Sequence, residues 1–311
     1  MNEIRKDCLL DRFVIIAEGR GRRPNDFAQP RPRLKAGGAC FFCPGNEGLT
    51  PPETGRVSDP KGRWLVRSFY NKFPAVSADY PCAGGSHEVL VETREHGKQM
   101  ADLSPRQIRL VLDLCAERTR KLEANRGTRY VSVFKNQGSA AGTSLLHSHS
   151  QILALAEIPP LVRREADAFR EAVKEGGECV FCRMAREERG GPRKIFEDEN
   201  MLVLAPYASR AAYEAWFVPK RHARKFTGLA PAEMDSLALM LKKTLLRLNA
   251  LFKYPSFNYY LHSACRGEDF HFHLELLPRL TVWAGFELGS GAYINPVSPE
   301  TAALHLRGRR A

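Results

Sequence analysis

One series of motifs occurs twice in this chain of 311 residues. Each copy contains, in order, a Cys-x-x-Cys pair, a lone histidine, a Leu-x-Pro element, an apolar segment of helical spacing, an alternating segment and a His-x-His pair. A single Cys-x-x-Cys pair arises easily by chance, whereas the same ordered series twice does not. The repetition predicts a duplicated domain, with an N-terminal copy over residues 1–158 and a C-terminal copy over residues 159–311.

The local patterns within each copy predict an α+β fold. Proline in the first turn is a helix-start signal, so helices are expected to begin near Pro105 and Pro231. Segments 130–134 and 257–261 alternate like half-buried strands. The segment 157–177 reads as a turn followed by a helix that joins the copies. We therefore expect an antiparallel sheet with helices in each of two repeats.

Composition and charge narrow the class of protein. The hydrophobic content of 43% and the charged content of 26% are typical of a globular protein. The sequence shows neither an apolar run long enough to span a bilayer nor a signal-peptide pattern, which favours a cytoplasmic protein without a membrane partner. The net charge is +12, but the basic clusters are not interleaved with aromatic residues. We expect a small polyanion such as a sugar nucleotide, and no nucleic acid.

Each copy also offers four residues of the types that bind zinc. Structural zinc commonly takes two thiolates from one short turn and histidines from elsewhere. The expected ligands are Cys40, Cys43, His96 and His147 in the first copy and Cys179, Cys182, His222 and His271 in the second. The alternative for a Cys-x-x-Cys pair is two small core residues or a redox pair. We expect two zinc ions per chain, and we interpret His87 and His305, which lie outside the repeat, as ordinary surface histidines.

The stretch His147-Ser148-His149-Ser150-Gln151 carries the expected chemistry. A strand places His147, His149 and Gln151 on one face. If His147 binds zinc, His149 remains free, and a neutral imidazole held on one nitrogen attacks with the other. The preceding segment 136–144 contains Gly138 and Gly142 and is either a simple turn or a cradle for phosphate.

These motifs resemble the galactose-1-phosphate uridylyltransferase family of the histidine-triad superfamily. The matching residues are Arg5, Asp7, Arg20, Arg23 and Pro24 near the N-terminus, then Asn71, Phe73 and Pro74, then Asn136, Gly138, Gly142 and Ser144, and finally His147, His149 and Gln151. The match extends over nearly the whole chain. The resemblance implies two histidine-triad-like domains and a homodimer with residues contributed across the interface.

The resemblance also implies a reaction in two displacements. His149 would attack the α-phosphorus of a nucleotide sugar, and a phosphate acceptor would then take the nucleotide. Gln151 would hydrogen-bond a phosphoryl oxygen, and His147 would bind zinc. The substrate-binding residues would be Arg20, Arg23, Asn71, Asn136, Gly138, Gly142 and Ser144, together with Gln151.

Several alternatives remain open within this reading. Uridylyl transfer from UDP-glucose to galactose 1-phosphate is the leading expectation. The serines in the histidine stretch and the lack of a lysine and a glutamine in segment 285–300 instead resemble the ADP-glucose phosphorylase branch, which uses inorganic phosphate. A nucleotide hydrolase and a non-catalytic zinc-binding protein are further alternatives. The second metal site could instead use Glu165, His262, His271 and His273.

Overall fold

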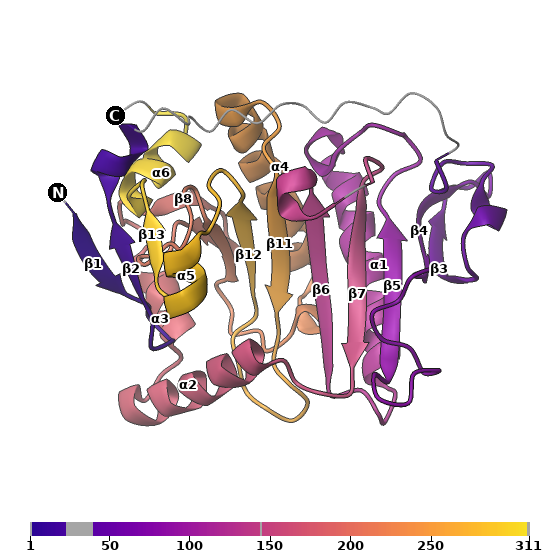
Figure 1. Cartoon of the computed structure of the whole chain (residues 1–311), viewed down its shortest axis with the longest axis horizontal. Helices are drawn as coiled ribbons and strands as arrows, with labels where there is room; N and C mark the ends of the chain where they lie inside the picture. Colours follow the sequence, from indigo (N-terminus) through magenta and orange to yellow (C-terminus); the bar gives the residue numbers. More distant parts are fainter. Residues whose placement is uncertain (1, 23–39, 144, 310–311) are drawn as a thin grey trace.

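The computed structural model describes residues 2–22, 40–143 and 145–309 (Figure 1). Its strands are β1 (Glu3–Lys6), β2 (Phe13–Ile16), β3 (Glu53–Ser58), β4 (Trp64–Tyr70), β5 (Gly85–Val91), β6 (Tyr130–Gln137), β7 (His149–Leu155), β8 (Lys194–Glu197), β9 (Met201–Leu204), β10 (Ala215–Pro219), β11 (Phe257–His262), β12 (His273–Pro278) and β13 (Tyr293–Asn295). Its α-helices are α1 (Pro105–Glu123), α2 (Pro160–Gly176), α3 (Val180–Glu187), α4 (Pro231–Phe252), α5 (Gly285–Ser290) and α6 (Pro299–Leu306). Short 3-10 turns are η1 (Glu18–Arg22), η2 (Glu47–Leu49), η3 (Met100–Asp102), η4 (Ser139–Ala141) and η5 (Phe226–Gly228).

The main sheet shows the duplication directly. Its ten strands have the order β3-β4-β5-β7-β6-β11-β12-β10-β9-β8, and every neighbouring pair is antiparallel. Read from one edge to the centre, the strands are β3-β4-β5-β7-β6; read from the other edge, they are β8-β9-β10-β12-β11. In both halves the last two strands in the chain are exchanged in the sheet. The expected α+β fold with two repeats is confirmed.

The two repeats share one sheet, joined between β6 and β11. Asn136 pairs with Asn258 there, and Phe134 pairs with Tyr260. The chain passes from one repeat to the other after β7, through α2, the connecting helix expected from the sequence. We propose that the division between the domains lies at residue 158, between the end of β7 and the start of α2.

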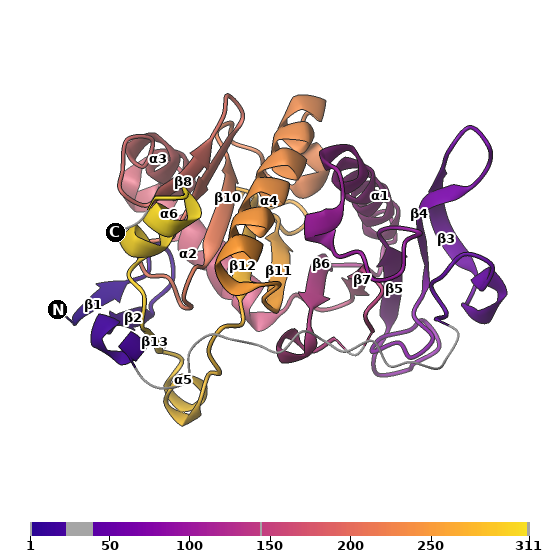
Figure 2. The ribbon, with the colours of Figure 1, turned by 90° about the horizontal axis from the view of Figure 1, so that it is seen from above.

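Helices α1 and α4 are equivalent elements and lie side by side on one face of the sheet (Figure 2). Both begin at the expected prolines, Pro105 and Pro231. The Ser104 side chain accepts a hydrogen bond from the backbone N–H of Gln107 at 3.1 Å, which caps α1. Glu233 reaches back to the N–H of Ala230 at 2.7 Å and caps α4.

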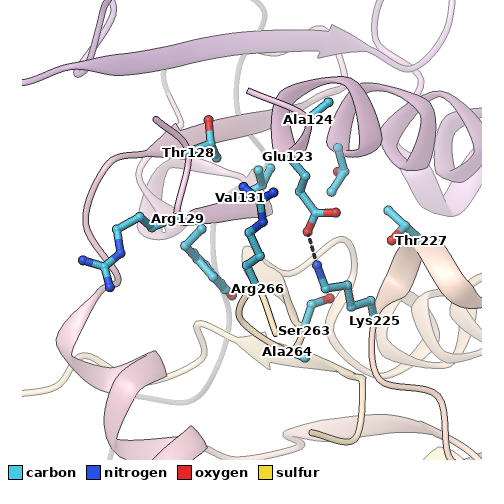
Figure 3. A pocket seen from close by; sticks show the side chains of 12 residues that line it. Glu123, Ala124, Thr128, Arg129, Val131, Lys225, Thr227, Ser263, Ala264 and Arg266 are labelled. Carbon is cyan, nitrogen blue, oxygen red and sulfur yellow. Dashed lines mark hydrogen bonds and ion pairs between the residues drawn. The ribbon is translucent and has the colours of Figure 1, made fainter. Parts of the chain in front are cut away.

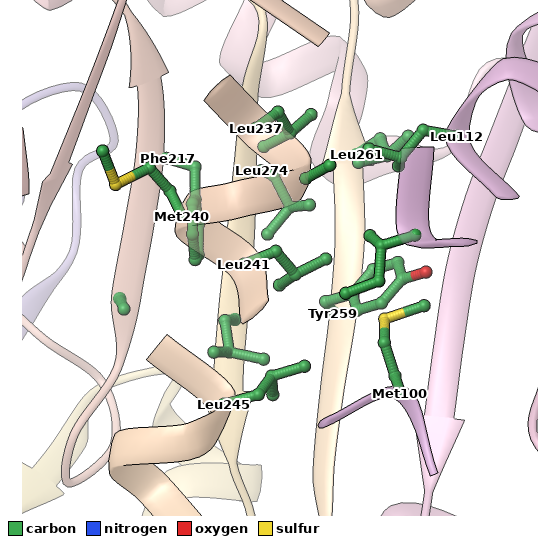
Figure 4. Close-up of a cluster of buried hydrophobic side chains, with 14 of the residues drawn as sticks. Met100, Leu112, Phe217, Leu237, Met240, Leu241, Leu245, Tyr259, Leu261 and Leu274 are labelled. Carbon is green, nitrogen blue, oxygen red and sulfur yellow. The ribbon is translucent and has the colours of Figure 1, made fainter. Parts of the chain in front are cut away.

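The core between these helices and the sheet shows which residues of each strand face the helices. Ile152 and Ala154 of β7 and Leu274 and Leu276 of β12 belong to the large apolar cluster against the helices; Figure 4 shows part of that cluster. Because side chains alternate along a strand, His149 and Gln151 of β7 lie on the opposite face. By the same alternation, His273 and Glu275 of β12 also lie on that opposite face.

That opposite face is covered differently in the two repeats. Over the second repeat it packs against α2 and α3, through an apolar cluster that includes Phe169, Phe181 and Trp216. Over the first repeat, a smaller cluster places Phe42, from the turn between the cysteines, against Val89 and Val91 of β5. The face that carries His149 is therefore the less covered one.

The remaining described strands form a small separate sheet. Its order is β1-β2-β13, and it joins the N-terminal segment to the C-terminal end of the chain (Figure 1). Within the described residues, every helix is too short or too polar to cross a bilayer.

Candidate active site

The four expected metal ligands of the first repeat converge. His147 Nδ1 lies 3.5 Å from Cys40 Sγ and 3.7 Å from Cys43 Sγ, and His96 Nδ1 lies 3.4 Å from Cys43 Sγ. The ligand atoms of all four residues lie within 4.8 Å of one another. The His147 Nε2 nitrogen is bonded to the carbonyl of Thr93 at 2.7 Å, which leaves Nδ1 for a metal.

The second repeat has the same arrangement. His271 Nδ1 lies 3.4 Å from both Cys179 Sγ and Cys182 Sγ, and His222 Nδ1 lies 3.5 Å from Cys182 Sγ. Tetrahedral zinc, with bonds of about 2.3 Å to sulfur and about 2.05 Å to nitrogen, separates these atoms by about 3.6 Å. Both clusters therefore fit zinc in donor type and in spacing. Nε2 of His271 is bonded to the carbonyl of Pro219 at 2.9 Å.

The alternative metal set of the second repeat is divided between two clusters. His271 lies with the thiolates, whereas Glu165 Oε2 lies 2.7 Å from His262 Nδ1, in a neighbouring buried group. That group also contains His273 and Glu275, and Arg210 donates a hydrogen bond to Glu275. The positive charge of the Arg210 guanidinium at this position would repel a divalent cation. The geometry thus favours the thiolate set.

The ring of His149 is held by the backbone just before β7, because the strand begins at His149 and His147 lies outside it, contrary to the sequence expectation of one strand through both. Its Nδ1 donates to the carbonyl of His147 at 2.9 Å. Nε2 makes no hydrogen bond within the part of the chain that the structure describes. Burial, and then the charge of Lys135, lowers the pKa of His149, which favours the neutral ring. A neutral imidazole with a tethered Nδ1 presents the Nε2 lone pair for attack.

A buried ion pair lies beneath His149, on the helix side of β7. Lys135 Nζ lies 2.8 Å from Glu92 Oε2, and both side chains are at most 1% exposed. The same ammonium donates to the carbonyl of His149 at 3.0 Å. Ser148 and Ser150 both donate to Glu92. The two serines of the histidine stretch therefore anchor β7 to the ion pair, and the sequence reasoning missed Lys135 and Glu92.

Gln151 is held by a histidine that was interpreted as a surface residue. His87 on β5 is only 8% exposed, and its Nε2 lies 2.9 Å from Gln151 Oε1. Asn71 Nδ2 lies 3.2 Å from the same Nε2, so this expected substrate-binding residue also lies at the site. The interpretation of His87 was wrong, because pairing with Gln151 on the neighbouring strand draws it inside. His305 is also not free on the surface, since its Nδ1 lies 2.8 Å from Tyr213 Oη.

The glycine segment follows β6 and turns back toward β7. Gly138 has φ 82°, and a Cβ there would clash with Ser256 of the second repeat. Gly142 has φ 87° and ends η4. Asn258 donates to Asn136 Oδ1 at 2.8 Å and to the carbonyl of Ala141 at 2.9 Å, which holds the turn. Ser144 lies outside the described residues.

Arg20 is not brought to His149 within the chain. Arg20 is exposed on η1, beside the small sheet, and Figures 1 and 2 both show this sheet on the far side of the second repeat from β7. Arg23 lies outside the described residues.

A cavity of about 230 Å³ opens at the other end of β6 (Figure 3). It lies between the end of α1, η5 and the turn after β11, where Lys225 and Glu123 form an ion pair at 2.9 Å. β6 begins there, at Tyr130, whereas Phe134 near its other end pairs with Gln151. This cavity is therefore separate from the His149 site.

Comparison with known proteins agrees with this geometry. The family model described as "Galactose-1-phosphate uridyl transferase, N-terminal domain" matches residues 79–159, and the model described as "Scavenger mRNA decapping enzyme C-term binding" matches residues 178–278. The chain is 32% identical to an ADP-glucose phosphorylase of Arabidopsis thaliana, over 98% of this chain and 92% of that protein. It is 30% identical to a galactose-1-phosphate uridylyltransferase of Thermotoga maritima, over 99% of this chain and 98% of that protein.

The chain belongs to the galactose-1-phosphate uridylyltransferase family.

Membership in this family makes the chain an enzyme, a nucleotidyltransferase. A solved structure of an ADP-glucose phosphorylase from Arabidopsis thaliana with bound ADP-glucose superposes with a TM-score of 0.89 at 31% identity, over 100% of this chain and 99% of that one. The two family models match separate repeats of the sheet, which agrees with the duplication read from the sequence.

Proposed function

We propose that this enzyme transfers a nucleoside monophosphate from a nucleotide sugar to a phosphate acceptor through a covalent intermediate on His149. The observation that carries the proposal is the tethered ring, with Nδ1 bonded to the His147 carbonyl and Nε2 available. In the first step the Nε2 lone pair attacks the α-phosphorus. The bond from that phosphorus to the bridging oxygen breaks, and the sugar 1-phosphate leaves with the electron pair.

The second step reverses the first with a different partner. A phosphate oxygen of the acceptor attacks the α-phosphorus, the phosphorus–nitrogen bond breaks, and His149 is regenerated. While the nucleotide is attached, the ring carries a positive charge, which the His147 carbonyl stabilises through Nδ1–H. The Gln151 amide donates to a phosphoryl oxygen, and the glycine turn from Gly138 to Gly142 receives phosphate at its backbone N–H groups.

We propose adenylyl transfer from ADP-glucose to inorganic phosphate as the reaction. Two observations support it: the TM-score of 0.89 to the ADP-glucose phosphorylase structure, and the lack of a lysine and a glutamine in segment 285–300. The second candidate is uridylyl transfer to galactose 1-phosphate. It is supported by the 30% identity to the Thermotoga maritima enzyme over nearly its full length.

We further propose one zinc ion in each Cys₂His₂ cluster, two per chain. A bound zinc ion would hold the Cys-x-x-Cys turn and the histidine ligands in place. His147 is the ligand that also provides the carbonyl for His149, so the first cluster is coupled to the nucleophile. All eight cysteines are free, which agrees with a reducing compartment, and we place the enzyme in the cytoplasm.

A homodimer accounts for the position of Arg20. We propose that Arg20 reaches the nucleotide bound in the partner subunit, because within one chain it lies away from β7. Mixing His149→Ala chains with Arg20→Ala chains should restore activity, since each mixed dimer then contains one complete site. Mixtures that stay as inactive as their components would contradict this arrangement, and light scattering should report the mass of two chains.

Incubation with nucleotide sugars labelled at the α-phosphate tests the proposed function. We expect ADP-glucose to transfer its label to the protein, in a bond stable to alkali and labile to acid, and His149→Ala to remain unlabelled. Inorganic phosphate should then release labelled ADP. Label from UDP-glucose, released by galactose 1-phosphate, would establish the second candidate instead. Turnover without an acceptor would indicate a hydrolase, and no label or turnover with either sugar would indicate a binding protein.

A further inference from the structure

The proton position on His87 is determined by its surroundings. The backbone N–H of Ala75 donates to His87 Nδ1 at 3.1 Å. A backbone N–H is always a donor, so Nδ1 is the acceptor nitrogen, and the neutral ring carries its hydrogen on Nε2. The Asn71 Nδ2 group is almost equidistant from the two ring nitrogens, at 3.4 Å from Nδ1 and 3.2 Å from Nε2, so it lies on the lone-pair axis of neither and does not set the tautomer. Burial lowers the pKa of His87, which favours this neutral form.

This tautomer in turn determines which way the Gln151 amide faces. His87 Nε2–H points at an atom of that amide 2.9 Å away, and a donor requires the carbonyl oxygen there. The NH₂ group of Gln151 must then point away from His87. It makes no hydrogen bond within residues 40–143 and 145–309, so it is available to a ligand.

The orientation matters because a phosphoryl oxygen only accepts hydrogen bonds. A rotated amide would present its own carbonyl oxygen to the phosphoryl group, and two acceptors repel. A carboxamide has nearly the same shape in both orientations, so packing alone does not distinguish them. The hydrogen bond from His87 provides that distinction.

The loop after β4 supports His87 from the other side. Asn71 N–H donates to the His87 carbonyl at 2.8 Å, and Asn71 Oδ1 accepts from the N–H of Phe73 at 2.9 Å. This arrangement shapes the loop that carries the Ala75 N–H. The chain of contacts therefore runs from the loop through His87 to Gln151.

We propose that His87 is a positioning residue that holds the Gln151 amide with its NH₂ group toward the phosphoryl group during transfer. The inference rests on the proposed function, because Gln151 must face a phosphoryl oxygen. His87 itself touches neither reacting atom in this role. In the strand register Val89 pairs with Gln151 and Trp216 pairs with Glu275, so the position equivalent to His87 is Glu214. The pairing of a histidine with the amide therefore belongs to the first repeat alone.

Two substitutions separate the hydrogen bond from the packing. His87→Gln keeps a side-chain donor near the position of Nε2, whereas His87→Asn keeps an acceptor near Nδ1 and loses the distant donor. We expect His87→Asn to lower the single-turnover rate of labelling about 10- to 100-fold, with KM and metal content unchanged. His87→Gln should recover most of that rate. If His87→Asn does not fold, His87→Leu takes its place against His87→Gln.

A double-mutant cycle with Gln151→Ala gives the decisive readout. If His87 acts through Gln151, adding His87→Asn to Gln151→Ala should cause no further loss of rate. Additive losses, or a His87→Asn rate within twofold of wild type, would overturn the inference. Wild-type protein that takes no label from any nucleotide sugar would instead refute the proposed function, so the two failures are distinguishable.

Discussion

Strands β7 and β12 each begin at the second histidine of the same motif in the same backbone geometry, but His149 is 9% exposed and His273 only 2%. His149 Nδ1 donates to the carbonyl of His147 at 2.9 Å, and His273 Nδ1 donates to that of His271 at 3.1 Å. The face of β12 is sealed by α2 and α3, and Phe181 stacks on His273 with ring centroids 4.5 Å apart. Under the proposed function, a tethered histidine is not sufficient for catalysis, because a phosphate must also reach it.

The residue two positions further on differs in a matching way. Gln151 is neutral and half-buried, whereas Glu275 is fully buried. Burial alone would raise the pKa of Glu275, but the charges of Arg210 and His262 outweigh it and hold that pKa well below its usual range. A carboxylate in this place repels phosphate and needs a cation beside it. The second repeat thus has a buried ion pair where the first repeat has the amide that we propose binds phosphate.

The largest expected effect comes from removing His149, whereas removing its counterpart His273 should leave the chemistry nearly unchanged. His149→Ala should lower turnover by roughly 10⁴-fold or more, because the other tethered histidine on this face, His273, is buried beneath α2 and α3. His273→Ala should still form the labelled intermediate at a rate near that of wild type. Labelling by His149→Ala, or its loss in folded His273→Ala, would break the comparison.

Gln151→Glu gives the first repeat the residue of the second. The carboxylate loses the amide donor and repels the phosphoryl oxygens, so we expect kcat to fall about 10²- to 10³-fold. Gln151→Met, which removes the donor without adding charge, is the matched control and should be less impaired. Equal rates for the two variants would show that charge repulsion contributes nothing.

Lys135→Met tests the support beneath His149. It leaves the Glu92 carboxylate buried without its cation, so the free energy of unfolding should fall by about 3–5 kcal/mol. The double variant Lys135→Met with Glu92→Gln should recover part of that loss in denaturant titrations. If the single variant is as stable as wild type, the ion pair does not anchor β7.

The two Cys-x-x-Cys pairs should be unequal in function. Cys43→Ser and Cys182→Ser should each reduce the zinc content by one ion per chain. We expect Cys43→Ser to lower the labelling rate by about 10- to 100-fold, since His147 carries the carbonyl that holds His149. Cys182→Ser should mainly lower stability. Elemental analysis and single-turnover labelling measure both, and a reversed order of activity would contradict the assignment.

The smallest expected effect is a pH dependence of the folding stability that arises from His87. Burial lowers its pKa in the folded chain, so the neutral ring contributes stability above the unfolded pKa of about 6.5. That contribution is lost as the pH falls through this value toward the lower folded pKa. Between about pH 7.5 and about pH 5, wild type should therefore lose more stability than His87→Gln. Parallel curves would show that His87 does not contribute.

The sequence predicted the parts of the molecule that repeat. The duplicated fold, the helix starts at Pro105 and Pro231 and the strand that carries His149 follow from periodicity and motif spacing, because local patterns determine them. The two cysteine and histidine sets were recognised for the same reason, and the structure brings each set together.

The supporting residues could not be found in this way. Lys135 and Glu92 are charged residues that appear solvent-exposed in a strand pattern, and only the pairing of β6, β7 and β5 shows that they meet inside. His87 has no counterpart histidine in the second repeat, so the repeat offered no signal for it. Its partner Gln151 lies on the neighbouring strand but 64 positions along the chain.

The contact between Gly138 and Ser256 makes the first repeat depend on the second. The turn that would receive phosphate belongs to the first repeat, but its wall is Ser256 and its clamp is Asn258, both from the second. The second repeat thus supports the proposed phosphate-binding turn of the first. The first repeat is therefore not expected to work alone, because a chain cut after β7 would lose that wall and leave the edge of β6 unpaired.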